Sequence, residues 1–321
     1  MRGLRQGRRL RHCSVPEPAD GGGSVALLPM SQSNGSEPVT EPLTVTEPLT
    51  VADVLALLQA AAPPELAEDW DSNGLICGDP AEPVRTVLLA VDPLTAVVNE
   101  AIGRGVDMVI THHPLYLRGT DHVAATDPKG RCVHRLIRAG IALANAHTSL
   151  DAAHGGVADA LAARVGLLGT RPLSPSRLDP AQGIGRIGEL EHPVRLRDLA
   201  VAVAAALPDS APGLLVGGDP DATVETVAVS GGAGDSLLAA AREAGADVFL
   251  TADLRHHPAT DHLEGGRPHL LCGTHWATEW VGLPPLAARL EAAAGERGRR
   301  LEAYVSEVVT DPWALRLSTG S

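Results

Sequence analysis

The sequence contains almost no lysine and very few aromatic residues. Lys129 is the single lysine among 26 basic residues, and Phe, Tyr and Trp together make up 2% of the 321 residues. The formal net charge is -13. Nucleic-acid binding without sequence preference relies on a basic surface and on aromatic stacking platforms, so this composition argues against it. A small anionic substrate would need a local cation, such as a metal ion, to bind.

Long apolar runs and closely spaced cysteines are lacking too. No apolar run is long enough to span a bilayer, and the Arg-rich start is not followed by the apolar stretch of a signal peptide. The four cysteines are far apart and form no CxxC pair, as is typical of reduced thiols. We therefore expect a cytoplasmic protein without a membrane partner.

The first residues differ in composition from the rest. Residues 1–48 are rich in Gly, Ser, Pro and Glu, and TEPLTV occurs twice in tandem, at 40–45 and 46–51. Such a segment cannot bury enough apolar surface to offset the entropy of ordering. We predict a disordered tail over 1–48 that limited proteolysis removes first. Met30 is an alternative to Met1 as the true start.

From Thr50 onwards the sequence alternates between strand and helix patterns. Thr50 and Asp53 have the spacing of a capping box at a helix start. Residues 84–91 and 106–111 are short apolar runs typical of buried strands, and 94–103 reads as a helix between them. This alternation indicates an α/β fold.

An internal repeat indicates two lobes. VRTVLLAV at 84–91 is similar to VETVAVSG at 224–231, and GVDMVIT at 105–111 is similar to GADVFLT at 245–251. Both pairs are 140 residues apart, and each copy predicts strand, helix, strand. We therefore expect two α/β lobes with mixed sheets that arose by internal duplication, with one copy in each lobe.

Candidate metal ligands follow three of the predicted strands. His112 and His113 come directly after 106–111, and His147 and Asp151 lie on the connecting loop after the apolar run 141–146. Ligand sites in α/β proteins lie at the carboxyl ends of strands. Each of these residues also has a simpler interpretation, as a polar loop residue or, for Asp151, as a turn or helix-capping residue.

The third segment is GTHWATEW at 273–280. His275 and Glu279 are four residues apart, so a helix would place both on one face, although exposed helices often carry such pairs. Three imidazoles and two carboxylates suit Zn, Mn, Fe, Co or Ni. Two ions that share a bridging carboxylate would form a recognised hydrolytic device.

With these motifs the chain resembles the dinuclear-metal-centre family, whose members are called GTP cyclohydrolase 1 type 2 homologues or NGG-one-interacting-factor-three-like proteins. The resemblance implies two divalent metal ions per subunit, held by His112, His113, Asp151, His275 and Glu279. It also implies a toroidal homohexamer. The matching segments are EDWDSNGLICGD (68–79), GVDMVITHHPLYLRG (105–119), AHTSLDAAHGGVADALAARVGL (146–167), GADVFLTADLRHH (245–257) and GTHWATEWVGLPPLAARL (273–290).

The same resemblance sets the expected domains and activity. It implies a discontinuous metal-binding α/β domain over 49–170 and 271–315, with a second α/β domain inserted over 171–270. The family name implies a metal-dependent hydrolase that opens the imidazole ring of a nucleotide, GTP. His147 would be a catalytic proton shuttle, or would instead orient Asp151 through a hydrogen bond. The alternatives are a phosphoesterase with the same metal pair and a non-catalytic metal-binding assembly or regulatory protein.

Two further features qualify this picture. Family members often have glycine where this chain has Ala252, while Asp253 keeps the acid that follows. The segment SGGAGDS at 230–236 would cradle a phosphate with its backbone N–H groups, or would simply be a tight turn.

Overall fold

The computed structural model describes residues 47–318. The tail predicted at 1–48, apart from its last two residues, and the alternative start at Met30 therefore lie outside the described residues. The described part is a mixed α/β protein, as predicted, with a five-stranded sheet, a six-stranded sheet and a short strand pair. None of its helices combines the length and the apolar character that crossing a membrane requires.

The five-stranded sheet has the order β13-β4-β5-β6-β2. Its first four strands are parallel, and β2 is antiparallel at the edge. The predicted strands at 84–91 and 106–111 are confirmed as the core of this sheet. The bounds are β13 (Glu302–Val305), β4 (Thr86–Ala90), β5 (Met108–Thr111), β6 (Ala142–Asn145) and β2 (Gly74–Cys77); β1 (Leu49–Thr50) pairs separately with β3 (Pro83–Val84).

The six-stranded sheet has the order β7-β8-β10-β11-β12-β9. Here β10, β11 and β12 are parallel, and the flanking pairs are antiparallel. The bounds are β7 (Leu168–Pro175), β8 (Gly183–Arg195), β10 (Thr223–Ala233), β11 (Val248–Ala252), β12 (His269–Gly273) and β9 (Leu215–Gly217).

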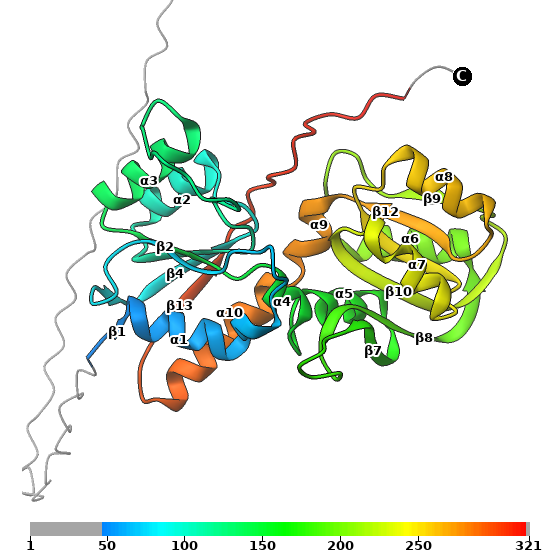
Figure 1. Cartoon of the computed structure of the whole chain (residues 1–321), viewed down its shortest axis with the longest axis horizontal. Helices are drawn as coiled ribbons and strands as arrows, with labels where there is room; N and C mark the ends of the chain where they lie inside the picture. The colour runs from blue at the N-terminus through cyan, green and yellow to red at the C-terminus, as the bar shows by residue number, and fades with distance from the viewer. Residues whose placement is uncertain (1–46, 319–321) are drawn as a thin grey trace, which may run out of the picture. The chain divides into compact units, whose positions relative to one another are not determined.

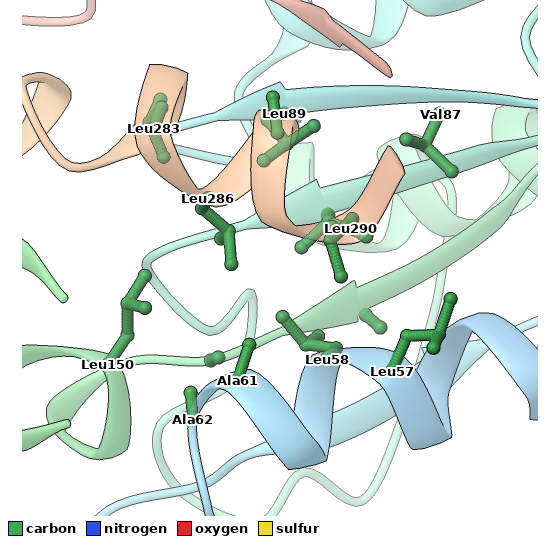
Figure 2. Packing of buried hydrophobic residues seen from close by; sticks show 14 of the residues in the cluster. Leu57, Leu58, Ala61, Ala62, Val87, Leu89, Leu150, Leu283, Leu286 and Leu290 are labelled. Atoms are coloured by element: carbon green, nitrogen blue, oxygen red, sulfur yellow. The ribbon is translucent and has the colours of Figure 1, made fainter. Parts of the chain in front are cut away.

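Helices cover both faces of the five-stranded sheet, with α1 and α10 on one face and α2 and α3 on the other (Figure 1). Side chains alternate along β4, so Val87 and Leu89 face α1 and α10 while Leu88 faces α2 and α3. Figure 2 shows Leu58 of α1 and Leu290 of α10 pointing into the same apolar cluster. The bounds are α1 (Val51–Ala61), α10 (Leu283–Glu296), α2 (Thr95–Arg104) and α3 (Pro128–Arg138).

The helix starts follow the local sequence. The capping box predicted at Thr50 is confirmed, because Asp53 N donates to Thr50 Oγ1 at 3.1 Å and Thr50 N donates to Asp53 Oδ2 at 2.9 Å. Helix α2 also matches the helix predicted at 94–103 within one residue.

The six-stranded sheet is covered in the same manner. Helices α5 and α6 pack on the face that Val227 and Val229 present, and α7 and α8 pack on the face of Phe249. Helix α9 contacts β10 and β11. The bounds are α4 (Thr148–Ala152), α5 (Val157–Val165), α6 (Leu196–Ala206), α7 (Leu238–Glu243), α8 (His256–Glu264) and α9 (His275–Trp280), with short 3₁₀ turns at Pro64–Leu66 and Asp235–Leu237.

The two predicted repeats have the same hydrogen bonds. Asp107 Oδ2 accepts from the N–H of Arg85 and Thr86, and its equivalent Asp247 Oδ2 accepts from the N–H of Glu225 and Thr226. The two repeats also have the same strand register. Val87 of β4 pairs with Met108 of β5, and the equivalent Val227 of β10 pairs with Val248 of β11. The repeats are thus parallel strand–helix–strand units, one in each sheet.

The chain completes the six-stranded sheet before it returns to the five-stranded one. Strands β7 to β12 lie in sequence between β6 and β13. The second lobe is therefore inserted in the first, as predicted, whereas the domain boundaries at 170/171 and 270/271 stay predictions.

Replacing Asp107 or Asp247 with Ala should destabilise the protein by a similar amount. Each change removes the acceptor of two backbone N–H groups, which costs about 1–2 kcal/mol. Chemical denaturation of both variants tests this, with Asp121→Ala, an exposed carboxylate in the 112–127 loop, as the control. If only one of the two variants loses stability, the two units are not equivalent.

Candidate metal centre

The candidate residues lie at strand ends, as predicted. His112 and His113 continue directly from β5, and their N–H groups donate to Ala90 O at 3.0 Å and Val91 O at 2.9 Å. The hydroxyl of Thr111 donates to His113 O at 2.7 Å. The backbone of the histidine pair is therefore fixed by the neighbouring strand.

Asp151 lies on a short helix, α4, where the sequence predicted a loop. The start of α4 is held by residues 74 and 77 positions earlier in the chain: His147 N donates to Asn73 Oδ1 at 2.6 Å, and Thr148 N donates to Asp71 Oδ2 at 2.9 Å. Because these acceptors are distant in the sequence, no local sequence pattern predicts this helical turn.

His275 and Glu279 lie one turn apart on α9, so the predicted helix is confirmed. Thr274 caps it by accepting from Ala277 N at 3.4 Å. The side chains meet, with His275 Nε2 2.9 Å from Glu279 Oε1.

The structure brings all five candidate ligands together around Glu279. His113 Nε2 lies 3.2 Å from Glu279 Oε2, and His112 Nε2 lies 3.6 Å from Glu279 Oε1. Asp151 Oδ1 also lies 3.6 Å from His112 Nε2. Residues from both sheets thus form a single donor cluster.

The three imidazoles of this cluster and the neighbouring ring of His147 are oriented in the same way. Each uses Nδ1 for a hydrogen bond to an acceptor outside the cluster, so a neutral ring that donates from Nδ1 keeps the lone pair of Nε2 free. The partners are Ala146 O for His112 (3.2 Å), Asp92 Oδ1 for His113 (2.8 Å), Asp71 Oδ1 for His147 (2.7 Å) and Asp253 Oδ2 for His275 (2.7 Å).

The side chain of His147 binds Asp71 and not Asp151. The interpretation of His147 as a hydrogen-bonded support for Asp151 is therefore wrong, because its Nδ1 is taken by Asp71 and only its backbone O contacts Asp151 N. Its ring lies 5.1 Å from that of His112 and 5.3 Å from that of His113, between centroids.

Two overlapping groups of side chains have donor atoms close enough to share an ion. One consists of His112, His113 and His147, and the other of His113, His275 and Glu279; within each group the atoms lie within 4.8 Å of one another. These His and Glu side chains can hold a metal ion.

The electrostatics of the cluster favour positive charge next to Glu279. Burial disfavours the imidazolium form of His113, but Glu279 and Asp92 outweigh it and raise the pKa of His113 to about 11. Glu279 and Asp253 likewise outweigh burial and raise the pKa of His275 to about 9. Burial would raise the pKa of Glu279, yet the three imidazoles hold it well below its usual range. A divalent cation would provide this positive charge in place of protons.

Two buried atoms of the cluster also fit a cation. In the described part of the chain, His112 Nε2 and Glu279 Oε2 have no hydrogen-bond partner. A buried polar atom left without a partner costs about 1–3 kcal/mol. Metal coordination at these atoms would remove this cost, so the donor set fits a cation.

The Gly-rich segment at 230–236 makes room for this cluster. Gly232 has a φ of +64°, and a Cβ atom there would overlap Glu279 Oε1. Its N–H donates to Thr278 Oγ1 at 3.0 Å, and its carbonyl accepts from Thr251 Oγ1 at 2.9 Å. Both polar groups of Gly232 are therefore used within the protein, in contrast to the phosphate cradle considered above.

Sequence reasoning missed the carboxylates that orient the imidazoles. Asp92 follows the first strand of the first repeat, so its place at a strand end could have identified it from the sequence. One of its oxygens contacts His113 Nδ1, and the other accepts from Thr310 Oγ1. Asp71 lies in the segment EDWDSNGLICGD, but its contact with His147 spans 76 positions and had no local signal.

Two cavities reach the cluster. One, of about 690 Å³, is lined by His113, His147, Asp151, His275 and Glu279 together with Trp70 and several serines. The other, of about 550 Å³, is lined by Asp92, His113, Asp253 and His275 and by the segment around Trp313. His113 and His275 thus line both cavities.

Known proteins are similar to this chain over most of its length. Residues 49–312 match the family model described as Duf34/NIF3 (NGG1p interacting factor 3). A Streptomyces coelicolor protein named GTP cyclohydrolase 1 type 2 homolog is 50% identical over 268 residues, which cover 83% of this chain and 94% of that protein. A Mycobacterium bovis protein with the same name is 34% identical, in an alignment that covers 83% of this chain and 97% of that protein.

Solved structures have the same fold. A hypothetical protein of Staphylococcus aureus superposes with a TM-score of 0.78 at 27% identity, covering 84% of this chain and all of that one. A Bacillus cereus protein related to NIF3 also gives 0.78, at 24% identity, covering 83% and 99%.

Asp92→Ala should weaken the binding of a divalent cation such as Zn²⁺ or Mn²⁺ by about 10–100-fold, as loss of an orienting partner does at metal sites. Calorimetric titration of protein stripped with a chelator measures this. Asp92→Asn keeps an acceptor for His113 Nδ1 and should lose less. Unchanged affinity in Asp92→Ala would contradict the positioning role.

Proposed function

Since the chain belongs to the Duf34/NIF3 family, we propose that it binds two divalent metal ions and is a metal-dependent hydrolase acting on a nucleotide. The observation that supports this most is the convergence of donors from both sheets on Glu279, with each imidazole presenting Nε2. The proposed ligands are His112, His113, Asp151, His275 and Glu279.

Glu279 would help to hold both ions, because its two oxygen atoms face different imidazoles. Its Oε1 faces His275 and His112, and its Oε2 faces His113. The group of His113, His275 and Glu279 lies entirely within the proposed ligand set. Nitrogen and oxygen donors suit Zn, Mn, Fe, Co or Ni. When bound, such ions act as Lewis acids that polarise a substrate oxygen or a water molecule.

His147 is the proposed proton carrier. Asp71 accepts from its Nδ1 and orients the ring, which leaves Nε2 as the atom that would carry the proton. Asp71 is suited to this because His147 and Thr148 outweigh its burial and hold its pKa far below the usual range. The ring also lines the larger cavity, where a substrate would lie.

The nucleotide substrate is proposed from the names of the relatives, GTP cyclohydrolase 1 type 2 homolog. We further propose a toroidal homohexamer in the cytoplasm, which light scattering and fractionation would test. The free thiols of Cys77, Cys132 and Cys272, three of the described residues, are consistent with a reducing compartment.

Protein purified without added metal should contain two divalent ions per chain by elemental analysis. Asp151→Ala and Glu279→Ala should lose more metal than His112→Ala, because each removes a carboxylate that would neutralise the charge of the ions. His147→Ala should keep most of its metal. If His147→Ala loses an ion, His147 is a ligand and the proton-carrier role is wrong.

A screen of nucleotides with metal-loaded protein should find turnover that Asp151→Ala abolishes. His147→Ala should lower kcat by about 10²–10⁴-fold, the usual contribution of acid–base catalysis. The control is Val201→Ala, an exposed site on α6. Metal and nucleotide binding without turnover would instead support the non-catalytic alternative, and cleavage confined to phosphate esters would support a phosphoesterase.

A further inference from the structure

Trp70 is exposed beside the donor cluster. Its exposed fraction is 58%, whereas Trp276, which packs in the core, has 5%. The indole ring stands nearly perpendicular to His147, with 5.8 Å between the ring centroids and an interplanar angle of 75°. Trp70 therefore packs edge-on against His147, and both residues line the 690 Å³ cavity.

The backbone that carries Trp70 is fixed on both sides. Glu68 N donates to Thr148 Oγ1 at 3.0 Å, and Asp71 N donates to Glu68 O at 2.9 Å. Asp71 in turn accepts from Thr148 N. An exposed aromatic ring on a fixed loop loses little entropy when a ligand packs on it, so the indole is ready to bind a flat partner.

The remaining walls of the cavity are small, polar or apolar. Ser174, Ser230 and Ser236 supply hydroxyl groups, and Ile184 and Leu237 supply apolar surface. None of the described residues that line the cavity is Lys or Arg, while Glu68, Asp151 and Glu279 are acidic. The basic side chains of this lining are the histidines of the cluster, and the rest of the wall offers an exposed indole, hydroxyl groups and apolar surface, which suit a flat, uncharged ring with hydrogen-bonding groups at its edge.

We propose that Trp70 is a stacking platform that holds the flat, uncharged ring system of a heterocyclic substrate, such as a nucleobase, next to the donor cluster. This inference rests on the proposed hydrolase function and specifies which part of the substrate the cavity recognises. The ring stacks on the indole, and the serine hydroxyls bind its polar edge. His147, in contact with Trp70, then lies beside the ring.

The test uses the full-length, metal-loaded protein and three probes: guanosine, GTP and ribose 5-phosphate. Calorimetry and quenching of tryptophan fluorescence give the dissociation constants. Guanosine should bind and quench, and ribose 5-phosphate should bind much more weakly. Trp70→Ala should weaken guanosine binding about 5- to 150-fold, the range found for loss of base stacking on an aromatic ring. Trp70→Phe should recover most of the affinity.

Trp313→Ala is the matched control, because Trp313 is similarly exposed, at 65%, and lines the other cavity. Its affinity for guanosine should equal that of the wild type, and all variants should retain their metal. The inference is overturned if no heterocyclic probe binds, if Trp70→Ala binds guanosine normally, if Trp70→Ala loses metal, or if Trp313→Ala is the weakened variant.

This experiment separates the inference from the hydrolase proposal. Guanosine binding that depends on Trp70, without turnover of any nucleotide, would support the platform and overturn the hydrolase. Turnover of GTP whose KM is the same in Trp70→Ala and the wild type would support the hydrolase and overturn the platform.

Discussion

The architecture around the candidate site depends on one buried carboxylate. Glu279 is 3% exposed, and an isolated charge at such depth would be costly. His112, His113 and His275 offset this cost, and they come from the ends of strands in two different sheets. Each imidazole is in turn oriented by an acceptor of its Nδ1 atom. The position of the imidazoles therefore also depends on Asp92, Asp253 and the backbone of Ala146.

Each of the two sheets contains one of the similar strand–helix–strand units and contributes side chains to the cluster. Candidate ligands follow β5 and β6 in the first sheet and β12 in the second. His113 and Asp253 occupy equivalent positions, 140 residues apart, after β5 and β11. His113 is part of the cluster, whereas Asp253 orients His275. The repeats thus share a framework and differ in the chemistry that each places at its strand ends.

Local patterns predicted the framework well, because strands such as β4 and β5 and the capping box at Thr50 depend on neighbouring residues. The repeat also predicted which units would be equivalent. Helix α4 and the partner of His147 were missed, since Asp71 and Asn73 act across more than seventy positions of sequence. The five candidate ligands were identified at strand ends, whereas the carboxylates behind them required the three-dimensional arrangement.

The insertion of the six-stranded sheet has a consequence for synthesis on the ribosome. Strand β13 pairs with β4 along its whole length, but it is made only after every strand of the second sheet. At about 5–20 residues per second, on the order of 10–40 s separate the emergence of β4 from that of β13. During this interval the nascent chain exposes the β4 edge that β13 later covers. Such an unpaired edge can pair with another chain, so this period is when a chaperone would be most useful.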